Sequence, residues 1–197
     1  MIEAGLFHRF DATNILNKNL ASIVTSISLD HLDWLPENEQ TIEKIVFEKT
    51  SKLLNSNIII AKQSSSEITD LIKETISNNT SQKKYFLDDY NYSFNENNFF
   101  YYEDKLGGFK LPNPNVKGQF QLENISTAIA TLRSIDQLNI KEDHIKQGIT
   151  KINNIARLQE ITSGKLKNLV GDNKLLVDGS HNPLGAKVLN KYLESLD

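Results

Sequence analysis

The segment 174–196 places an apolar strand, a tight polar turn and an amphipathic helix in direct succession. Lys174–Val177 predicts a short strand, and Pro183 falls in the first turn of a helix expected over Asn182–Leu196. The turn between them starts at Asp178 and puts carboxylate, imidazole and amide groups beyond the carboxyl end of the strand. Ligands of α/β proteins bind at this place, so the turn suits a phosphate or a ribose.

Strands and helices alternate earlier in the chain too. Ser22–Ser28 and Asn57–Ala61 predict strands, and Thr41–Leu54 and Ser66–Ile76 have the apolar spacing of amphipathic helices. This order favours an α/β fold with a mostly parallel sheet and helices. The remaining stretches predict helices at Leu122–Leu138 and Lys141–Lys151, strands at Phe99–Tyr102 and Leu158–Ile161, a loop around Gly164–Asn173, and no clear element over Asn78–Asn98.

Composition narrows the class of protein. The 197 residues, 39% of them hydrophobic, can form one domain or parts of two. A net charge of −3 without a dense Lys/Arg run argues against a nucleic-acid partner. The absence of cysteine excludes thiolate metal sites and thiol nucleophiles and fits a reducing cytosol. Since no apolar run approaches the roughly 20 residues that a bilayer needs, and no secretory signal is seen, we expect a cytoplasmic protein without a membrane partner.

Four polar clusters fall where α/β proteins hold ligands: residues 3–14, 30–33, 121–124 and 178–182. Each also has an ordinary structural explanation. Asp178 can be a helix N-cap, His31 can be a structural histidine, and Lys49 and Glu3 can be solvated surface residues. From the residues alone, the sequence indicates a ligand-binding α/β fragment.

The clusters also follow one another in a distinctive order. Glu3-Ala-Gly-Leu-Phe-His-Arg-Phe-Asp-Ala-Thr-Asn14 precedes Thr25-Ser-Ile-Ser-Leu-Asp-His-Leu-Asp-Trp-Leu35, and four shorter motifs follow: Ile42–Lys49, Gln121-Leu-Glu-Asn124, Ala156-Arg-Leu-Gln159 and Leu176–Pro183. In this order they resemble the motifs of the folylpolyglutamate and dihydrofolate synthase family, which belongs to the Mur ligase superfamily. The resemblance covers nearly the whole chain, apart from the stretch around Ser64–Asn98.

The resemblance implies a partial central ATP-binding domain over residues 1–153, followed over 154–197 by the start of a Rossmann-like C-terminal domain, the glutamate ligase domain. It also implies a reaction in which ATP phosphorylates the carboxylate of dihydropteroate or a folate and the amine of L-glutamate attacks the acyl phosphate. The implied cofactors are ATP and Mg²⁺. Such chemistry relies on positioning and on neutralising the charge of the transferred phosphoryl group.

The resemblance further implies a role for nine residues. The magnesium ligands would be Glu3 and His31, and the catalytic residues would be His181 and Lys49, which corresponds to a lysine that is carbamylated in the family. The residues that contact ATP would be Asn124, Arg157 and Asp178. The residues that line the pterin site would be Asp11 and Ala12.

The chain departs from the family pattern in two ways. Phe7 and His8 replace a glycine pair, where glycine would permit close backbone approach, and Thr50-Ser51 and Ala156 replace an Ala-Gly pair and a glycine. No Gly-x-x-x-x-Gly-Lys-Ser/Thr pattern occurs in the sequence. We therefore expect a partial chain, without the triphosphate loop and most of the C-terminal domain, that is inactive alone. The alternatives are a subunit that completes a split synthase with a separate fragment bearing the loop, and a non-catalytic remnant.

Overall fold

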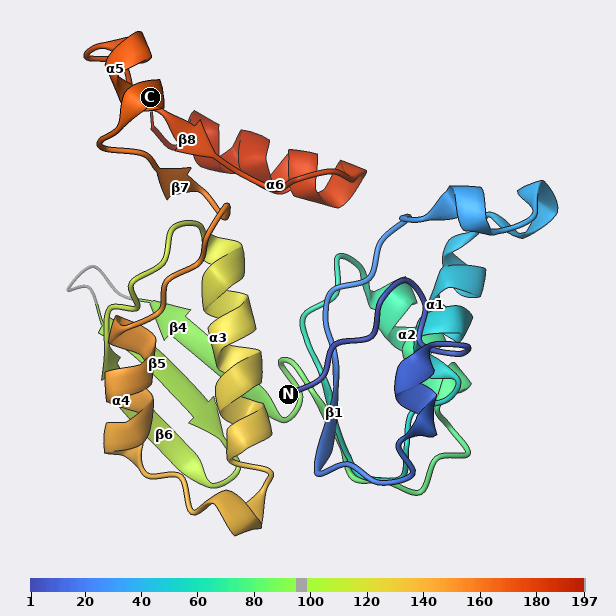
Figure 1. Cartoon of the computed structure of the whole chain (residues 1–197). Helices are drawn as coiled ribbons and strands as arrows, with labels where there is room; N and C mark the ends of the chain where they lie inside the picture. The colour runs from blue at the N-terminus through green and yellow to red at the C-terminus, as the bar shows by residue number, and fades with distance from the viewer. Residues whose placement is uncertain (95–98, 197) are drawn as a thin grey trace.

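A three-stranded parallel sheet lies at the centre of the first unit of the fold. The computed structural model describes residues 1–94 and 99–196 (Figure 1). Strands β1 (Ala21–Val24), β2 (Asn57–Ile60) and β3 (Lys83–Tyr85) lie in the order β1-β2-β3, with parallel pairing throughout. Helices α1 (Ile42–Thr50) and α2 (Ser66–Thr75) connect consecutive strands, as parallel pairing requires.

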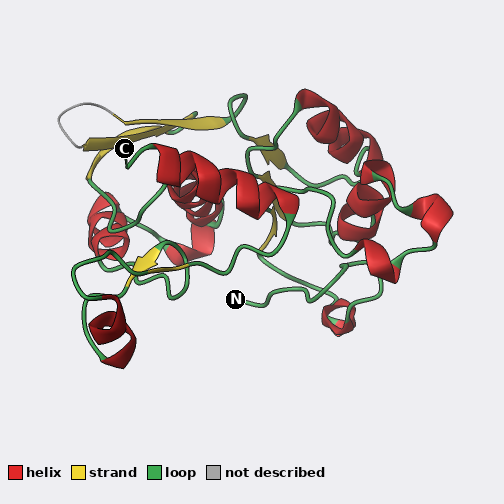
Figure 2. Ribbon diagram, turned by 90° about the horizontal axis from the view of Figure 1, so that it is seen from above, coloured by secondary structure: helices red, strands yellow, loops and turns green. Residues whose placement is uncertain are grey.

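The apolar run of β2 is buried because both faces of the parallel sheet are covered. Ile58 and Ile60 point into a core shared with α1 and α2, whereas Ile59 points into a second core on the opposite face. Seen from above, helices lie on both sides of these strands (Figure 2). A continuous apolar strand is typical of this arrangement. The first core contains Val24, Ile27, Ile45, Val46, Ile58, Ile60, Ile68, Ile72 and Ile76.

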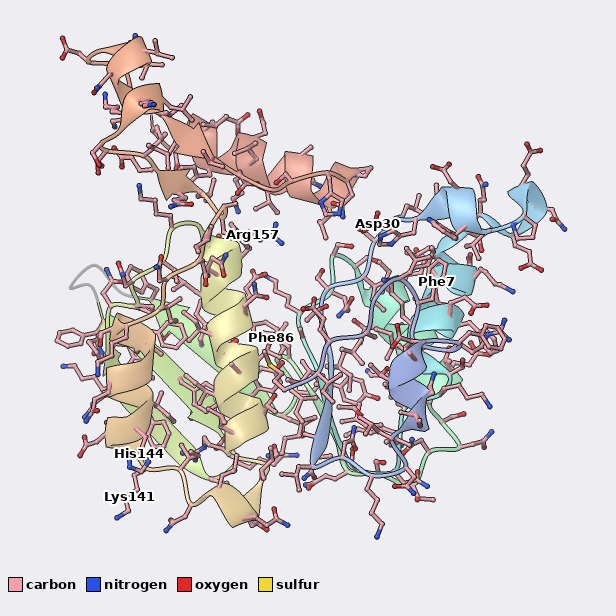
Figure 3. The ribbon with its side chains drawn as sticks, in the orientation of Figure 1. Phe7, Asp30, Phe86, Lys141, His144 and Arg157 are labelled. Atoms are coloured by element: carbon pink, nitrogen blue, oxygen red, sulfur yellow. The ribbon has the colours of Figure 1, made fainter. Side chains whose placement is uncertain are left out.

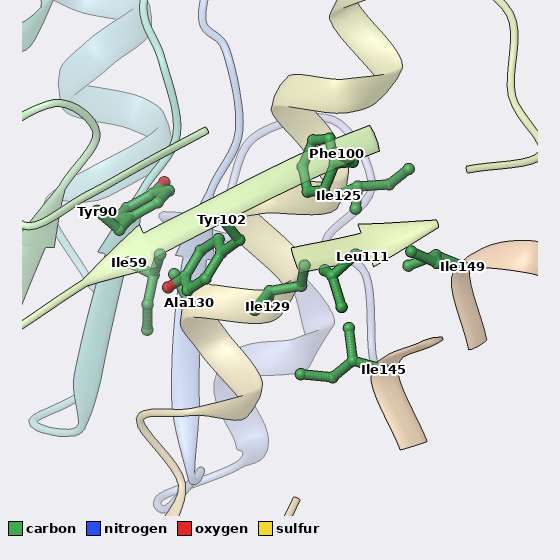
Figure 4. Close-up of a cluster of buried hydrophobic side chains, with 10 residues drawn as sticks. All are labelled: Ile59, Tyr90, Phe100, Tyr102, Leu111, Ile125, Ile129, Ala130, Ile145 and Ile149. Carbon is green, nitrogen blue, oxygen red and sulfur yellow. The ribbon is translucent and has the colours of Figure 1, made fainter. Parts of the chain in front are cut away.

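An antiparallel sheet forms the second unit. Strands β4 (Tyr90–Phe94), β5 (Phe99–Asp104) and β6 (Gly107–Pro112) pair in the order β4-β5-β6, and α3 (Gln119–Leu132) and α4 (Glu142–Thr150) pack against the sheet. The tyrosine hydroxyl of Tyr90 donates to the carbonyl of Ile60 at 2.9 Å and so joins the two units. The second core, drawn in Figure 4, contains Ile59, Tyr90, Phe100, Tyr102, Leu111, Ile125, Ile129, Ala130, Ile145 and Ile149.

A buried ion pair fixes the end of α3 to the β5–β6 hairpin. Arg133 Nε and Nη2 donate to the two carboxylate oxygens of Asp104 at 2.7 and 2.9 Å. The Tyr102 hydroxyl and the backbone N–H of Leu106 also donate to this carboxylate, at 2.9 and 2.8 Å. The guanidinium lies 4.2 Å from the ring centroid of Phe109. All hydrogen-bonding capacity of the Asp104 carboxylate is thus directed at groups that fix the hairpin.

The C-terminal segment crosses above the two units (Figure 1). It contains β7 (Gln159–Glu160), α5 (Lys165–Val170), β8 (Leu176–Val177) and α6 (Pro183–Glu194), and β7 pairs with β8 in antiparallel fashion. Among residues 154–196, only Leu158 is buried. The segment is therefore held on the rest of the chain mainly by polar contacts.

The short 3₁₀ helices of the chain are Ala12–Ile15, Leu32–Trp34, Glu37–Glu39 and Asp136–Leu138.

The structure confirms the α/β fold with a parallel sheet and corrects several element boundaries. The loop predicted around Gly164–Asn173 contains α5, whose six residues between Gly164 and Gly171 are too few to show a period. The helix predicted over Leu122–Leu138 begins at Gln119 and ends at Leu132, and the one predicted over Thr41–Leu54 ends at Thr50. The stretch Asn78–Asn98 contains β3 and β4, and its residues 95–98 lie outside the described residues.

The predicted domain boundary near Asn153 falls in the connection between α4 and β7 and stays a prediction. Within residues 1–94 and 99–196, no helix has the length and apolarity that a membrane crossing demands.

Candidate functional site

The loop after β1 presents a carboxylate and an imidazole side by side. His31 has a left-handed backbone with φ 56°, which non-glycine residues rarely adopt, and its N–H donates to Asp30 Oδ1 at 2.9 Å. The second carboxylate oxygen of Asp30 lies 3.6 Å from His31 Nδ1. This nitrogen is buried and has no hydrogen-bond partner in the part of the chain that the structure describes. The loop therefore holds an unused imidazole nitrogen beside an acidic group.

The first turn of α6 meets this loop from the other end of the chain. Asn182 caps α6 by accepting from the N–H of Gly185 at 2.8 Å, and its amide donates to Asp30 Oδ2 at 3.0 Å, across 152 residues of sequence. Burial raises the pKa of Asp30, but the Asn182 hydrogen bond and the nearby imidazoles of His31 and His181 outweigh burial and hold the pKa below its ordinary value. Two predicted site residues, His31 and His181, thus lie around one carboxylate.

Lys49 faces the same carboxylate from α1. Its Nζ donates to the carbonyl of Leu6 at 3.3 Å and lies 5.7 Å from the ring centroid of Phe7. Burial lowers the pKa of Lys49, because it disfavours the ammonium, and the negative charge of Asp30 opposes this effect. Figure 3 labels Phe7 and Asp30, which lie on neighbouring loops near α1. The structure therefore brings Lys49 together with His31 and His181 around Asp30.

An ion pair that sequence reasoning missed anchors the N-terminal segment to α1. Arg9 Nε donates to Glu48 Oε2 at 2.8 Å, and the backbone N–H of Arg9 donates to the carbonyl of Glu48 at 2.9 Å. Glu48 is only 4% exposed. Both residues lie inside the sequence motifs. A buried position for Glu48 on α1 would have indicated that its carboxylate needs a basic partner such as Arg9. This contact holds Leu6 and Phe7 beside Lys49.

The structure does not join Glu3 to the other predicted metal ligand. Glu3 is exposed in a coil, and no hydrogen bond or ion pair links it to His31 within the described ranges. Those same ranges contain no group of three or more His, Asp or Glu side chains placed to hold a metal ion. The assignment of Glu3 and His31 as magnesium ligands therefore stays a prediction.

Asp11 is engaged in holding its own loop. It accepts from the N–H of Thr13 at 2.8 Å and from that of Gly5 at 2.9 Å. The hydrogen bonds from Thr13 lower the pKa of Asp11 to about 2. Ala12 follows as the first, exposed residue of the 3₁₀ helix. Their place in a pterin site stays a prediction.

Asp178 fastens the β8–α6 turn to the segment before β7. Its carboxylate accepts from the N–H of Leu158 at 2.8 Å and from that of Ser180 at 2.9 Å. Burial raises the pKa of Asp178, but the bonds from Ser180 and Leu158 and the charge of Arg157 keep the pKa below its ordinary value. The predicted ATP contacts Arg157 and Asp178 are thus neighbours.

Arg157 lines an open cavity of about 500 Å³, together with Lys117, Gln121 and Leu158. The label in Figure 3 places Arg157 near the first turn of α3. Asn124 is exposed one turn further along α3 and lies 3.5 Å from the side-chain oxygen of Gln121. The cavity therefore joins the start of α3 to the C-terminal segment, and its charged lining consists of Arg157 and the paired Lys117 and Glu160.

The fold and these loops define an α/β protein in which the loop after the parallel strand β1, helix α1 and the β8–α6 turn bring His31, Lys49 and His181 around Asp30. No family model matches the chain. The chain is 29% identical over 202 residues to the dihydrofolate synthase/folylpolyglutamate synthase of Escherichia coli, covering 100% of this chain and 42% of that protein. It is 25% identical to a probable dihydrofolate synthetase of Schizosaccharomyces pombe, covering 99% of this chain and 45% of that protein.

Solved structures agree with the sequence comparison. The structure of Escherichia coli FolC in complex with DHPP and ADP has a TM-score of 0.79 and 28% identity, over 98% of this chain and 42% of that chain. An FPGS–AMPPCP–folate complex has a TM-score of 0.79 and 24% identity, over 100% of this chain and 47% of that chain, and at this identity the likeness shows the fold alone. The chain is thus similar to dihydrofolate and folylpolyglutamate synthases, and it spans somewhat less than half the length of the curated relatives it matches.

Proposed function

We propose that the chain contributes part of the active site of an ATP-dependent ligase that adds L-glutamate to dihydropteroate or a folate. The convergence of His31, Lys49 and the 178–182 turn on Asp30 supports this proposal most strongly, because these groups come from distant parts of the sequence. The solved Escherichia coli FolC structure, which is in complex with DHPP and ADP, supports the same kinds of small-molecule ligand. We propose a cytoplasmic location, with neither nucleic acid nor a membrane as a partner.

In this proposal, ATP transfers its terminal phosphoryl group to the substrate carboxylate, and the glutamate amine then displaces phosphate from the acyl phosphate. Arg157 and Asp178 contact the nucleotide together with Asn124, and Lys49 and His181 are the catalytic residues. Asp11 and Ala12 line the pterin site. A cationic fork such as that of Arg157 suits phosphate oxygens. Magnesium would neutralise phosphate charge, with Glu3 and His31 as its proposed ligands.

The first test is an assay of the purified 197-residue chain with ATP, Mg²⁺, L-glutamate and dihydropteroate. We expect no glutamate-dependent release of phosphate above the rate without protein, because the sequence contains no Gly-x-x-x-x-Gly-Lys-Ser/Thr loop to hold a triphosphate. The measurement is phosphate release over time, with folate as a second acceptor. Sustained turnover by this chain would show that the proposal of inactivity is wrong.

A second candidate function is that of one subunit in a two-chain synthase. One edge of β1 is unpaired among the described strands, and Ile23 on this strand is 43% exposed. An open, partly apolar strand edge favours pairing with another chain. Mixing with a fragment that bears the phosphate loop should then restore glutamate-dependent phosphate release. If mixing restores nothing and ATP with Mg²⁺ leaves the melting temperature of the chain unchanged, a non-catalytic remnant is supported instead.

A further inference from the structure

The side chain of Gln63 ties together the two segments that follow the neighbouring parallel strands β1 and β2. Gln63 lies shortly after β2, and its Oε1 accepts from the backbone N–H of Ile27 at 2.9 Å. Its Nε2 donates to the carbonyl of Thr25 at 3.3 Å. Both partners belong to residues 25–31, the segment that begins directly after β1 and ends at His31. One amide group therefore holds a donor and an acceptor of this segment.

The surrounding hydrogen bonds permit one orientation of the Gln63 amide. Its Nε2 also donates to the carbonyl of Ala61 at 2.8 Å, so both of its N–H groups have acceptors. A reversed amide would turn its oxygen toward the carbonyls of Thr25 and Ala61 and its N–H groups toward the N–H of Ile27. The network therefore requires a side chain that donates on one side and accepts on the other.

The segment 25–31 has little else to hold it. Ile27 is its only buried residue, at 3% exposed. Apart from the two bonds to Gln63, no hydrogen bond of the described structure reaches residues 25–29. Asp30 follows directly, and its carboxylate accepts from the Asn182 amide at the start of α6. The position of Asp30 therefore depends on how residues 25–29 are held.

We propose that Gln63 is a positioning residue, which sets the place of Asp30 in the candidate site and thereby the docking of α6. Gln63 has no contact with α6 of its own and acts along the chain from Ile27 to Asp30. The Asn182–Asp30 bond is 3.0 Å long, and a shift of about 1 Å at Asp30 breaks it, because N–H···O bonds are limited to roughly 2.7–3.2 Å. The importance of this role for catalysis rests on the proposed function.

The test is Gln63→Glu in the full chain, with hydrogen–deuterium exchange of α6 as the measurement. Glutamate has the shape of glutamine and can still accept from the N–H of Ile27, but it turns an oxygen toward the carbonyls of Thr25 and Ala61. We expect the amides of α6 to exchange about fivefold faster than in the wild type, the factor that corresponds to one hydrogen bond of typical net strength. Exchange in α3 should not change.

A double-mutant cycle separates positioning from general destabilisation. Asn182→Ala removes the bond to Asp30, so Gln63→Glu should not accelerate α6 exchange further in an Asn182→Ala chain. Gln63→Met, which keeps the length of the side chain without a donor or a charge, should act in the same direction as Gln63→Glu and serves if that variant fails to fold.

The matched control is Gln40→Glu. Gln40 Nε2 also donates to a backbone carbonyl of the β1–α1 connection, that of Leu35 at 3.2 Å, but this contact lies beyond Asp30 in the chain. Gln40→Glu should leave α6 exchange at its wild-type rate.

Three results would overturn the proposal: wild-type exchange of α6 in folded Gln63→Glu and Gln63→Met chains, an equal acceleration by Gln63→Glu with and without Asn182, or an equal acceleration by Gln40→Glu. Exchange is measured without substrate, so these results leave the ligase proposal standing. Failure of a loop-bearing fragment to restore phosphate release counts against the ligase proposal and leaves the exchange result unchanged.

Discussion

Replacement of Asp104 by alanine is expected to lower the free energy of unfolding by about 3–5 kcal/mol, because it leaves a buried arginine without its partner. The side chains of Arg133 and Asp104 are only 10% and 2% exposed, so the solvent compensates poorly for the lost carboxylate. The substitution also removes the acceptor of the Tyr102 hydroxyl and of the Leu106 N–H. Urea denaturation followed by circular dichroism measures the effect.

A surface ion pair provides the matched control. Lys117 and Glu160 are 2.7 Å apart, but their side chains are 39% and 38% exposed. Glu160→Ala should therefore change stability by less than about 1 kcal/mol. If Asp104→Ala and Glu160→Ala had similar small effects, the Asp104–Arg133 pair would not hold the hairpin to α3 as described.

The pH dependence of this pair has a definite sign. Burial raises the pKa of Asp104, but the Arg133, Leu106 and Tyr102 hydrogen bonds outweigh burial and hold the pKa below its ordinary value of 3.8. A carboxylate with a lowered pKa contributes stability that is present above pH 3.8 and is lost as the pH falls through the folded-state pKa. Acid unfolding of Asp104→Asn should accordingly be less steep below this pH than that of the wild type.

Replacement of Phe100 by alanine is expected to be about as severe, at about 3–5 kcal/mol, because it empties a large volume in the second core. Phe100 is 0% exposed and stacks on Tyr92 with ring centroids 5.4 Å apart. The sheet and α3 meet at this side chain, as Figure 4 shows. The midpoint of urea denaturation measures the loss.

Leu106→Ala in the adjacent hairpin turn is the control for Phe100→Ala. Leu106 is 71% exposed, and its truncation should change stability by no more than about 0.5 kcal/mol. A Phe100→Ala chain as stable as Leu106→Ala would show that the antiparallel sheet does not depend on this core.

The sequence predicted the elements whose side chains alternate or repeat cleanly. The strand Asn57–Ala61 and the helix Ser66–Ile76 match β2 and α2 within a residue, because β2 is a continuous apolar run buried on both faces and the apolar residues of α2 repeat toward one core. β3 was missed, because Lys83 and Lys84 give it the composition of a charged edge strand. The end of α3 was placed too late, because Ile135 continues the apolar spacing of the helix but lies beyond its end, directly before the 3₁₀ helix Asp136–Leu138.

The sequence predicted the motifs of the candidate site, but it could not predict how their side chains are arranged in space. The resemblance marked His31, Lys49 and His181, but only the fold shows that they surround Asp30. The Asn182–Asp30 hydrogen bond spans 152 residues, and local spacing carries no information on such a contact. The contacts of Phe7 were equally hidden, since the sequence showed a ring in place of a glycine but not that this ring lies beside His31 and Lys49.

None of the twelve residues of α6 is buried, so this helix lacks an apolar anchor of its own. Two side-chain hydrogen bonds hold the helix on the rest of the chain. Asn182 at its start donates to Asp30 at 3.0 Å, and Lys191 near its end donates to Gln119 at 3.2 Å. Segments with so few buried contacts open at a small fraction of the global unfolding free energy. Amide protons of α6 should consequently exchange with deuterium far sooner than those of α3. Loss of the Asn182–Asp30 hydrogen bond alone would let His181 move away from Asp30.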